Sequence, residues 1–449
     1  MPLAAQDDIT TQSGPSGYNG AWVTGPASNP LSFLNGPAYR TTGSNEPYDF
    51  RDFRPATGLN QHLPWWISFG VEERFRVEGF RNGGFKAAND DSYFLNRFRY
   101  QANVQLRPWW KVVGQVQDSR PFDQKPPVGP PNENRWELKL AYTEFGDPEK
   151  QWISVRVGRQ LINYNNTLIA NSEWRNQGRS YDAAVVNLRH DRYRLGIFAA
   201  SVVQPLASGI SHHAPGNNIY GLYGGVERLM PNSVLEPFVL WRVQSTARID
   251  EKAYGIRLKG RAVRDLDYSW EGVMERGSTH AWGTTGGAGY RFDNLRWHPR
   301  TFGQYDFASG GHGRTFDTMY PTAHDRFGML DLLGWQNVRA VRAGATVEPH
   351  HRWTATAQYL NFWLADATDA LYNSSGGSIV RDATGRSGRH IGEEFDVYTW
   401  YELNRHVNVG FGIGHLAPGT FLAKNTRGPS YTSPYFAINF KDAGKPDAR

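Results

Sequence analysis

The sequence has no cysteine among its 449 residues. This absence fits a protein that crosses an oxidising periplasm, because it avoids the mispairing of thiols. No stretch of about 18 apolar residues occurs and the mean hydropathy is −0.59, so transmembrane helices are excluded. The chain is longer than one ordinary soluble core supports, yet no linker divides it. A single closed β structure escapes that limit, because its interior need not be filled.

Lysine is scarce: it supplies only 10 of the 49 basic residues, which leaves 39 arginines, and the net charge is +6. Arginine binds carboxylate and phosphate groups through a planar two-pronged guanidinium, whereas lysine is a hydrated point charge. The bias therefore indicates either sites for anions or the codon usage of a GC-rich genome. No run of like charges is present, so nucleic acid is not an expected partner.

A secretion signal is also missing, since MPLAAQDDIT has neither a basic start nor an apolar centre. We expect the sequence to be the mature form of an exported protein. Residues 1–63 are rich in Gly, Pro, Ser and Asn, which predicts an irregular N-terminal arm that either packs in or across a mouth of the fold or is disordered. Residues 441–449 predict a C-terminal tail, and residues 64–440 form the domain between them.

Alternation of apolar and polar residues dominates this domain. Near its start, Phe75 and Val77 share one face of a strand while Arg74 and Arg76 share the other, because successive side chains point to opposite sides. We count roughly 16 to 18 such segments of about 10 residues, the length of a tilted strand that spans a membrane. No helix pattern offers a layer to cover the apolar face, so lipid is its expected partner.

The connections between these segments alternate in length. Short ones are expected at 107–109, 190–192, 264–265, 349–351 and 404–406. Long ones are expected at 119–135, 161–181, 203–218, 298–335, 363–390 and 417–432. The sequence thus predicts an all-β fold, a transmembrane antiparallel up-and-down β-barrel of about 16–18 strands, with 18 favoured. A β-propeller is disfavoured because no repeat with a signature at each four-strand period is present.

The polar face carries candidate residues for an anionic solute. A polyuronate has a carboxylate on every sugar, so its path needs fixed cations that hold each one weakly enough for release. The cations expected to face the lumen are Arg74, Arg76, Arg97, Arg99, Arg156, Arg257, Lys259 and Arg261. The inward carboxylates expected to pair with some of them are Glu72, Glu78, Glu137, Glu271, Glu394 and Asp396. The alternative is a purely structural ladder of ion pairs across a wet interior.

Aromatic residues near strand ends are expected to form the girdles of a membrane barrel, where amphipathic rings sit at the lipid headgroups. Ordinary packing is the alternative for each of them. The set comprises Trp65, Trp66, Trp109, Trp110, Trp152, Tyr193, Trp353, Trp400 and Tyr401.

Two motifs resemble those of the alginate export family of outer-membrane barrels. The first comprises Val157-Gly158-Arg159-Gln160, Asn163-Tyr164, Trp174 and Gly178-Arg179-Ser180-Tyr181-Asp182. The second comprises Thr315-Phe316-Asp317, Tyr320-Pro321-Thr322, His324 and Gly334-Trp335-Gln336-Asn337. The likeness runs from about Trp65 to Phe440. It implies a monomeric barrel of about 18 strands in the outer membrane of a Gram-negative bacterium, which secretes an anionic polysaccharide through an arginine-lined pore.

Within these motifs, Arg159 and Arg179 join the candidate cations. The other motif positions expected to build the site are Gly158, Gln160, Asn163, Tyr164, Trp174, Gly178, Asp182, Asp317, Trp335 and Asn337. Trp174 and Trp335 either stack on sugar rings or pack a loop that folds inward. We expect the long segment 161–181 to fold into the lumen.

The expected function is an outer-membrane channel for an alginate-like polyuronate. Two alternatives stay open: a general or small-anion porin of the same fold, and a structural or adhesive barrel plugged by residues 1–60. An enzyme is not expected, because HExxH is absent and Gly283–Tyr290 lacks the helix that follows a phosphate loop. No cofactor or metal is expected. Expected partners are outer-membrane lipid, an anionic polysaccharide or other anionic solute, and periplasmic export proteins.

Overall fold

The computed structural model describes residues 55–442, except 127, 129–131, 149, 165–166, 228, 230–231, 264, 323, 325, 405 and 427. Most of the predicted arm and residues 443–449 of the predicted tail lie outside the described residues. Among those described, no helix is long and apolar enough to cross a lipid bilayer.

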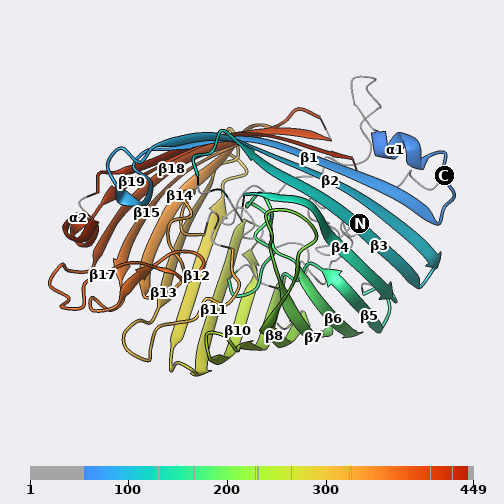
Figure 1. The fold of residues 1–449 in the computed structure, drawn as a ribbon, viewed down its shortest axis with the longest axis horizontal. Coiled ribbons are helices and arrows are strands. Elements are labelled where there is room, and N and C mark those ends of the chain that lie inside the picture. Colours follow the sequence, from blue (N-terminus) through green and yellow to red (C-terminus); the bar gives the residue numbers. More distant parts are fainter. Residues whose placement is uncertain are drawn as a thin grey trace.

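Eighteen antiparallel strands form one sheet that closes into a ring (Figure 1). Each strand pairs with its neighbours in chain order, and β20 pairs with β1 from Val71↔Asp442 to Glu78↔Tyr435. The strands are β1 Ile67–Phe80, β2 Asp91–Arg107, β3 Trp110–Phe122, β4 Asn134–Phe145, β5 Ile153–Gln160, β6 Tyr181–His190, β7 Tyr193–Gln204, β8 His212–Glu227, β9 Ser233–Gln244, β10 Ile249–Val263, β11 Leu266–Gly277, β12 Trp282–Arg291, β13 Arg300–Ala308, β14 Val338–His350, β15 Trp353–Leu364, β18 His390–Glu402, β19 Val407–Pro418 and β20 Tyr431–Asp442.

The alternation of the sequence sets the two faces of this wall. On β1, Phe75 and Val77 are 41% and 45% exposed on the outside, whereas Arg74 and Arg76 are 6% and 2% exposed on the inside. The same apolar outer face recurs around the ring, for example at Phe411 on β19. An apolar outer band and a polar interior are typical of a barrel whose solvent on the outside is lipid. The predicted fold class is confirmed.

The structure corrects four of the predicted boundaries. Strand β13 lies inside the connection predicted at 298–335, so the loop there is only 309–337. The hairpin β16 Ala370–Tyr372 and β17 Ser378–Arg381 occupies the connection at 363–390, and helix α2 Thr420–Thr426 occupies that at 417–432. Helix α1 Pro55–Asn60 lies in the arm predicted to be irregular. A single 3-10 turn, η2 Gly83–Phe85, follows β1.

The last strand also runs two residues past the predicted boundary at Phe440. Lys441 and Asp442 remain paired with β1. Asp442 is fully buried, and its carboxylate accepts a hydrogen bond from the backbone N–H of Ala56 in α1 at 2.8 Å. These contacts fix α1 to the seam where the barrel closes.

One of the predicted girdle residues points the other way. Trp400 is only 6% exposed, because it lies on the inner face of β18 and packs near Tyr435. Trp65, Trp109 and Trp353 are exposed, at 70%, 51% and 42%. Trp400 therefore belongs to the packing of the interior.

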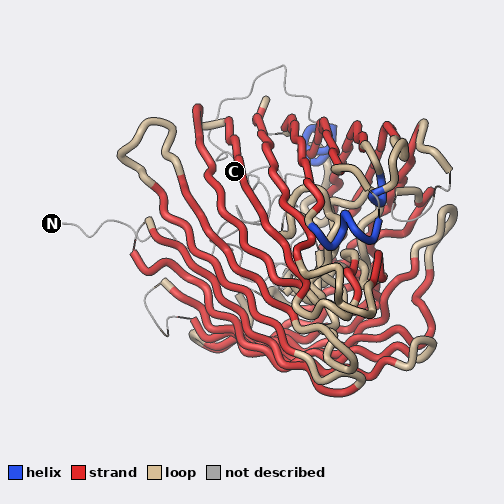
Figure 2. Tube along the Cα trace, turned by 90° about the vertical axis from the view of Figure 1, so that its left-hand side faces the viewer, coloured by secondary structure: helices blue, strands red, loops and turns tan. Residues whose placement is uncertain are grey.

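Long loops fold into the ring of strands (Figure 2). The first inner loop, residues 161–180, touches inward side chains of β1 and β2 on one wall, and Thr167 bonds Glu271 on β11. The second inner loop, residues 309–337, bonds inward carboxylates of β18 through the backbone N–H groups of Met329 and Leu330. The predicted inward course of segment 161–181 is confirmed.

Candidate functional site: the β1–β2 arginines and the inner loops

Four inward arginines are concentrated on β1 and β2. The register pairs Arg74 with Arg97 and Glu72 with Arg99, while Arg76 lies one inward position further along β1. We call Arg74, Arg76, Arg97 and Arg99 the β1–β2 arginines; they are 2–6% exposed. Like charges directly opposite on a sheet repel, so this cluster requires negative partners.

The first inner loop supplies many of those partners through its backbone. Arg74 donates to the carbonyl oxygens of Glu173 and Arg175 at 2.9 and 3.0 Å. Arg97 donates to the same Glu173 carbonyl at 3.0 Å, and Arg76 donates to that of Trp174 at 2.6 Å. Hydrogen bonds from a charged guanidinium are stronger than those between neutral groups, and its planar fork of donors fixes their geometry. Residues 173–175 are thus held against the arginine wall.

The carboxylate of Glu173 completes the contact. It accepts a hydrogen bond from Arg99 at 2.7 Å and lies 3.5 Å from Arg97. Burial opposes its ionisation, but Arg99, Lys139 and Arg97 outweigh this effect and lower its pKa to about 2. Glu173 is therefore an anion at neutral pH, and the loop presents a negative charge where the wall is positive.

Trp174 follows Glu173 in the first inner loop, and its ring lies between the side chains of Arg76 and His324. Its ring stacks on that of His324 from the second inner loop, with centroids 3.9 Å apart and planes 3° from parallel. The guanidinium of Arg76 lies 4.2 Å from the ring centroid, within the range of a cation–π contact. His324 in turn lies 3.1 Å from Asp331. Trp174 therefore packs a folded-in loop, the second of the two roles considered for it.

The two motif-bearing loops meet each other in the interior. The backbone N–H of Ala170 donates to Tyr320 at 2.9 Å, and that of Tyr320 donates to Leu168 at 2.9 Å. Arg179 donates to the carbonyl of Ala170 at 2.9 Å and lies 5.5 Å from the ring of Tyr320. Residues that are about 150 positions apart in sequence thus form one assembly, which neither motif indicates by itself.

The first motif also fixes the base of its loop. Gly158 has φ of 121°, and a Cβ there would lie 2.3 Å from the carbonyl oxygen of Ala141, so only glycine fits this irregular strand position. Beyond it, Arg159 bonds Asp182 at 2.8 Å and Glu137 at 3.0 Å. The side chain of Gln160 is fully buried, and its amide donates to the carbonyl of Ala183 at 2.9 Å.

Three further residues of the first motif support the loop in different ways. Tyr164 stacks between Phe198 on β7 and Tyr223 on β8, at centroid distances of 5.3 and 4.7 Å. Gly178 has φ of 68°, a conformation that favours glycine. Asn163 is half-buried at the start of the loop.

The second motif is buried as well. Asp317 pairs with Arg242 on β9. The indole N–H of Trp335 donates to the carbonyl of Phe307 at 3.1 Å, and its ring is 1% exposed. The side chain of Asn337 is fully buried and donates to the carbonyl of Ala370 at 2.9 Å. Trp335 therefore packs inside the protein and presents no free ring face.

The remaining predicted cations are not grouped with the β1–β2 arginines. Arg156 on β5 pairs with Glu144 and lies over the ring of Tyr142. On β10, Arg257 lies 3.8 Å and Lys259 3.2 Å from Glu236 of β9. Arg261 is exposed near the short-turn end.

Several of the predicted inward carboxylates do pair with inward arginines. Glu72 pairs with Arg97, Glu78 pairs with Arg76 at 2.6 Å, and Glu271 lies 3.9 Å from Arg257. Glu394 has another role, since it accepts the backbone N–H of Leu330.

Sequence reasoning missed three contributors to this site. Glu173 was not singled out, although it is the only carboxylate between Leu161 and Arg179 and could have been found on that ground. Lys139 is fully buried and donates to the carbonyl of Gln177 at 3.0 Å. Arg326 bonds Asp306 at 3.0 Å and lies 4.5 Å from the ring of Trp335.

Guanidinium groups in such a cluster have the chemistry to bind carboxylates and other anions. The site holds clustered guanidinium groups together with carboxylates and backbone carbonyl oxygens of the two inner loops. Among residues 55–442 as described, no group of three or more His, Asp and Glu side chains is arranged to hold a metal ion.

Comparison with known proteins adds family and fold. The alginate export family matches residues 65–435. No curated protein matches the sequence. OccK9 (OpdG) of Pseudomonas aeruginosa is 12% identical, with a TM-score of 0.59 over 84% of this chain and 98% of that one. OccAB2 of Acinetobacter baumannii is 11% identical, with a TM-score of 0.58 over 83% and 97%. The outer membrane protein opdK of Pseudomonas aeruginosa is 9% identical, with a TM-score of 0.58 over 83% and 98%.

Proposed function

The chain belongs to the alginate export family of outer-membrane barrels, and from this we propose that it is a channel for an anionic polysaccharide, alginate or another polyuronate. A channel of the outer membrane agrees with both the family and the porin-like fold, which are not those of enzymes. What we propose beyond an outer-membrane channel is its solute, a polyuronate.

The proposal rests on the groups that accept hydrogen bonds from the β1–β2 arginines. Their donors are met by a carboxylate and by neutral carbonyl oxygens of residues 173–175. A polyuronate offers the same two kinds of acceptor, a carboxylate and several oxygens on every sugar. The first inner loop is therefore a built-in competitor that holds the arginines until a polymer replaces it.

This arrangement suits transport better than tight binding. Conduction requires sites that attract the solute and also release it. A loop that rebinds the arginines behind each sugar lowers the net affinity for the polymer and keeps the path closed when no polymer is present. In this proposal the first inner loop is the gate, and Glu173 is the group that the polymer displaces.

The test is the single-channel current of the purified barrel in a planar bilayer, with and without a polyuronate. Anion-selective current that the polymer blocks, but that a neutral polysaccharide of equal length does not, is the expected result. Changing Arg97 and Arg99 to Gln should weaken the block. Arg296→Gln, an exposed arginine in the turn after β12, serves as the matched control. Current that is indifferent to polymer would favour a general or small-anion porin, and a silent barrel would favour a plugged structural role.

A further inference from the structure

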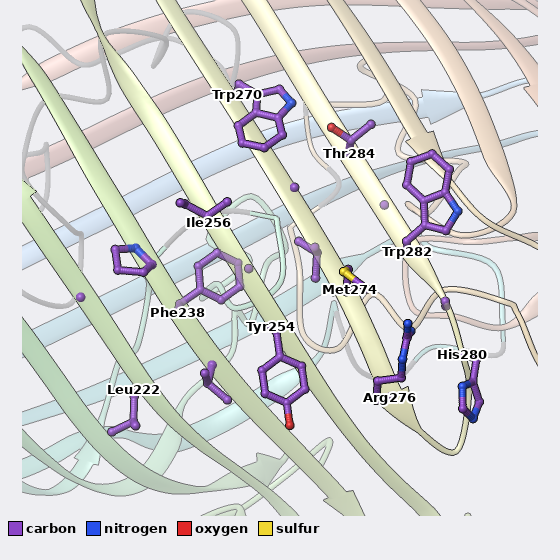
Figure 3. Close-up of a pocket in the computed structure, with 18 of the residues that line it drawn as sticks. Leu222, Phe238, Tyr254, Ile256, Trp270, Met274, Arg276, His280, Trp282 and Thr284 are labelled. Carbon is purple, nitrogen blue, oxygen red and sulfur yellow. The ribbon is translucent and has the colours of Figure 1, made fainter. Parts of the chain in front are cut away.

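An apolar groove crosses the outer face of the barrel over β8–β12 (Figure 3). Its volume is about 1070 Å³. Gly224 and Gly272, both at outward positions, carry no side chain, so Pro237 lies against the first and the ring of Trp270 folds over the second. Ile256, Trp270 and Met274 line the groove at 38%, 46% and 53% exposure. The wall is thus hollowed on the side that faces lipid, over a width of several strands.

Two arginines and a histidine lie at one end of this groove. Arg276, His280 and Arg314 all line it. The backbone N–H of His280 donates to Gly313 at 2.9 Å, so the β11–β12 loop is tied to the second inner loop beside Arg314. Lys252 is the cross-strand partner of Arg276. The cations of this end therefore come from three separate segments of the chain.

These cations have few counter-charges. Lys252 lies 3.2 Å from Asp250. Arg276 donates to the backbone carbonyl of Glu275. In the part of the chain that the structure describes, neither Arg276 nor Arg314 has a carboxylate within 4.0 Å. Two guanidinium groups are thus available above an apolar groove.

The orientation of the barrel places this end in the outer leaflet. Long loops of outer-membrane barrels lie outside the cell and short turns lie in the periplasm. The β11–β12 loop and the two inner loops emerge on the same side of the sheet. Trp282, 50% exposed at the start of β12, lines the groove near Arg276 and His280, at the level where interfacial aromatic rings are enriched.

We propose that this groove is a binding site for a phosphorylated, multiply acylated glycolipid of the outer leaflet, of the lipid A type. One acyl chain lies in the apolar groove, where burial of its methylene groups provides affinity. The phosphates bind Arg276 and Arg314, since guanidinium groups match phosphate oxygens in pairs. An arginine near the end of β11 and another on the second inner loop suit a head group with more than one phosphate. The inference needs only an outer-membrane barrel and does not depend on which solute the channel passes.

The test measures lipid retention by native mass spectrometry of the refolded barrel, titrated with a hexa-acylated lipid A bisphosphate. Arg276→Gln with Arg314→Gln should weaken the apparent affinity roughly 10- to 100-fold, from the loss of charge-assisted hydrogen bonds. Thr284→Trp, which fills the groove, should weaken it without any change of charge. Arg296→Gln and Val341→Trp, an exposed arginine at the opposite rim and an outward position on β14, are the matched controls.

Two comparisons make the outcome decisive. Removing both phosphates from the lipid should lower its affinity for the unaltered barrel to that of the double arginine variant. Heat-modifiable migration in gels verifies that each variant is folded. Equal lipid binding by the unaltered barrel and the double variant, or equal loss in the control variants, overturns the proposal. Retention of a phosphatidylglycerol as strongly as the bisphosphate would also overturn it, because the site would then be a general annular contact.

Discussion

The carboxylate of Glu173 is the group whose removal should most directly alter the channel. Glu173→Gln keeps the shape of the side chain and one hydrogen-bonding oxygen but removes the charge that faces Arg97 and Arg99. Glu173 takes no part in the pairing of the strands, and Gln at this position can still accept a hydrogen bond from Arg99. The expected effect is therefore on the position of the first inner loop, and the barrel itself should fold normally.

The size of the effect follows from the contacts. Hydrogen bonds to charged groups contribute about 1.5–3 kcal/mol, and breaking a fully buried ion pair costs about 3–5 kcal/mol. The Glu173 side chain is 38% exposed, so solvent screening favours the lower figure. A loss of about 1.5–2 kcal/mol shifts the ratio of undocked to docked loop by roughly 10- to 30-fold.

The assay is the open-to-closed ratio of single channels in a planar bilayer without polymer. Glu173→Gln should raise that ratio by roughly tenfold or more. Glu133→Gln is the control, because Glu133 pairs with Arg135, whose side chain is 53% exposed. A ratio for Glu173→Gln equal to that of the unaltered channel would refute the gating role of the loop. Combining Glu173→Gln with Arg99→Gln should give less than the sum of the two effects, since the two residues share one interaction.

Four further results are expected. Because the pKa of Glu173 is about 2, below its ordinary 4.5, its stabilisation of the docked loop is complete above pH 4.5 and is lost as pH falls towards 2; channel opening should rise across that window and stay flat in Glu173→Gln. Trp174→Ala removes the ring between Arg76 and His324 and should favour the open channel by about 1–3 kcal/mol, below the range for a fully buried Trp; an unchanged open-to-closed ratio would contradict this. Gly158→Ala should sharply reduce the yield of heat-modifiable barrel, because its Cβ would meet a backbone oxygen at 2.3 Å, and a normal yield would show that the strand adapts. Val397→Arg, outward and 39% exposed on β18, should cost about 2–4 kcal/mol in unfolding measured in lipid vesicles, whereas Arg at an outer rim position should cost far less.

Most strands could be predicted because each shows the alternation of apolar and polar residues within its own sequence. Alternation is local, and a wall with lipid outside and polar groups inside enforces it strand by strand. Strand β13 was missed since both of its faces carry aromatic residues, Phe302 inside at 5% exposure and Tyr305 outside at 44%. Trp400 misled for a related reason: the interior accepts large rings wherever the inner loops pack against the wall.

The site was only half predictable. The alternation of apolar and polar side chains along the strands identified four inward arginines, and the structure places all of them inside: Arg74, Arg76, Arg97 and Arg99. Their partners on the first inner loop lie 74 to 102 positions away in the chain, and strand patterning contains no information about such contacts. The motifs indicated that residues 161–181 were special, but not that they would cover the arginines.

The pairing of β20 with β1 has a consequence for how the protein assembles. The first and last described strands differ by about 360 positions, so the final seam is among the most non-local contacts a chain of this size can form. Until it forms, β1 and β20 each present a row of unpaired N–H and C=O groups, which readily recruit strands from other chains. Loss of residues 431–442 would leave the edges of β1 and β19 open for good. Pairing of β20 with β1 is therefore the assembly step that yields a closed monomer and prevents aggregation through open strand edges. The hydrogen bond from Ala56 to Asp442 stabilises this closed state.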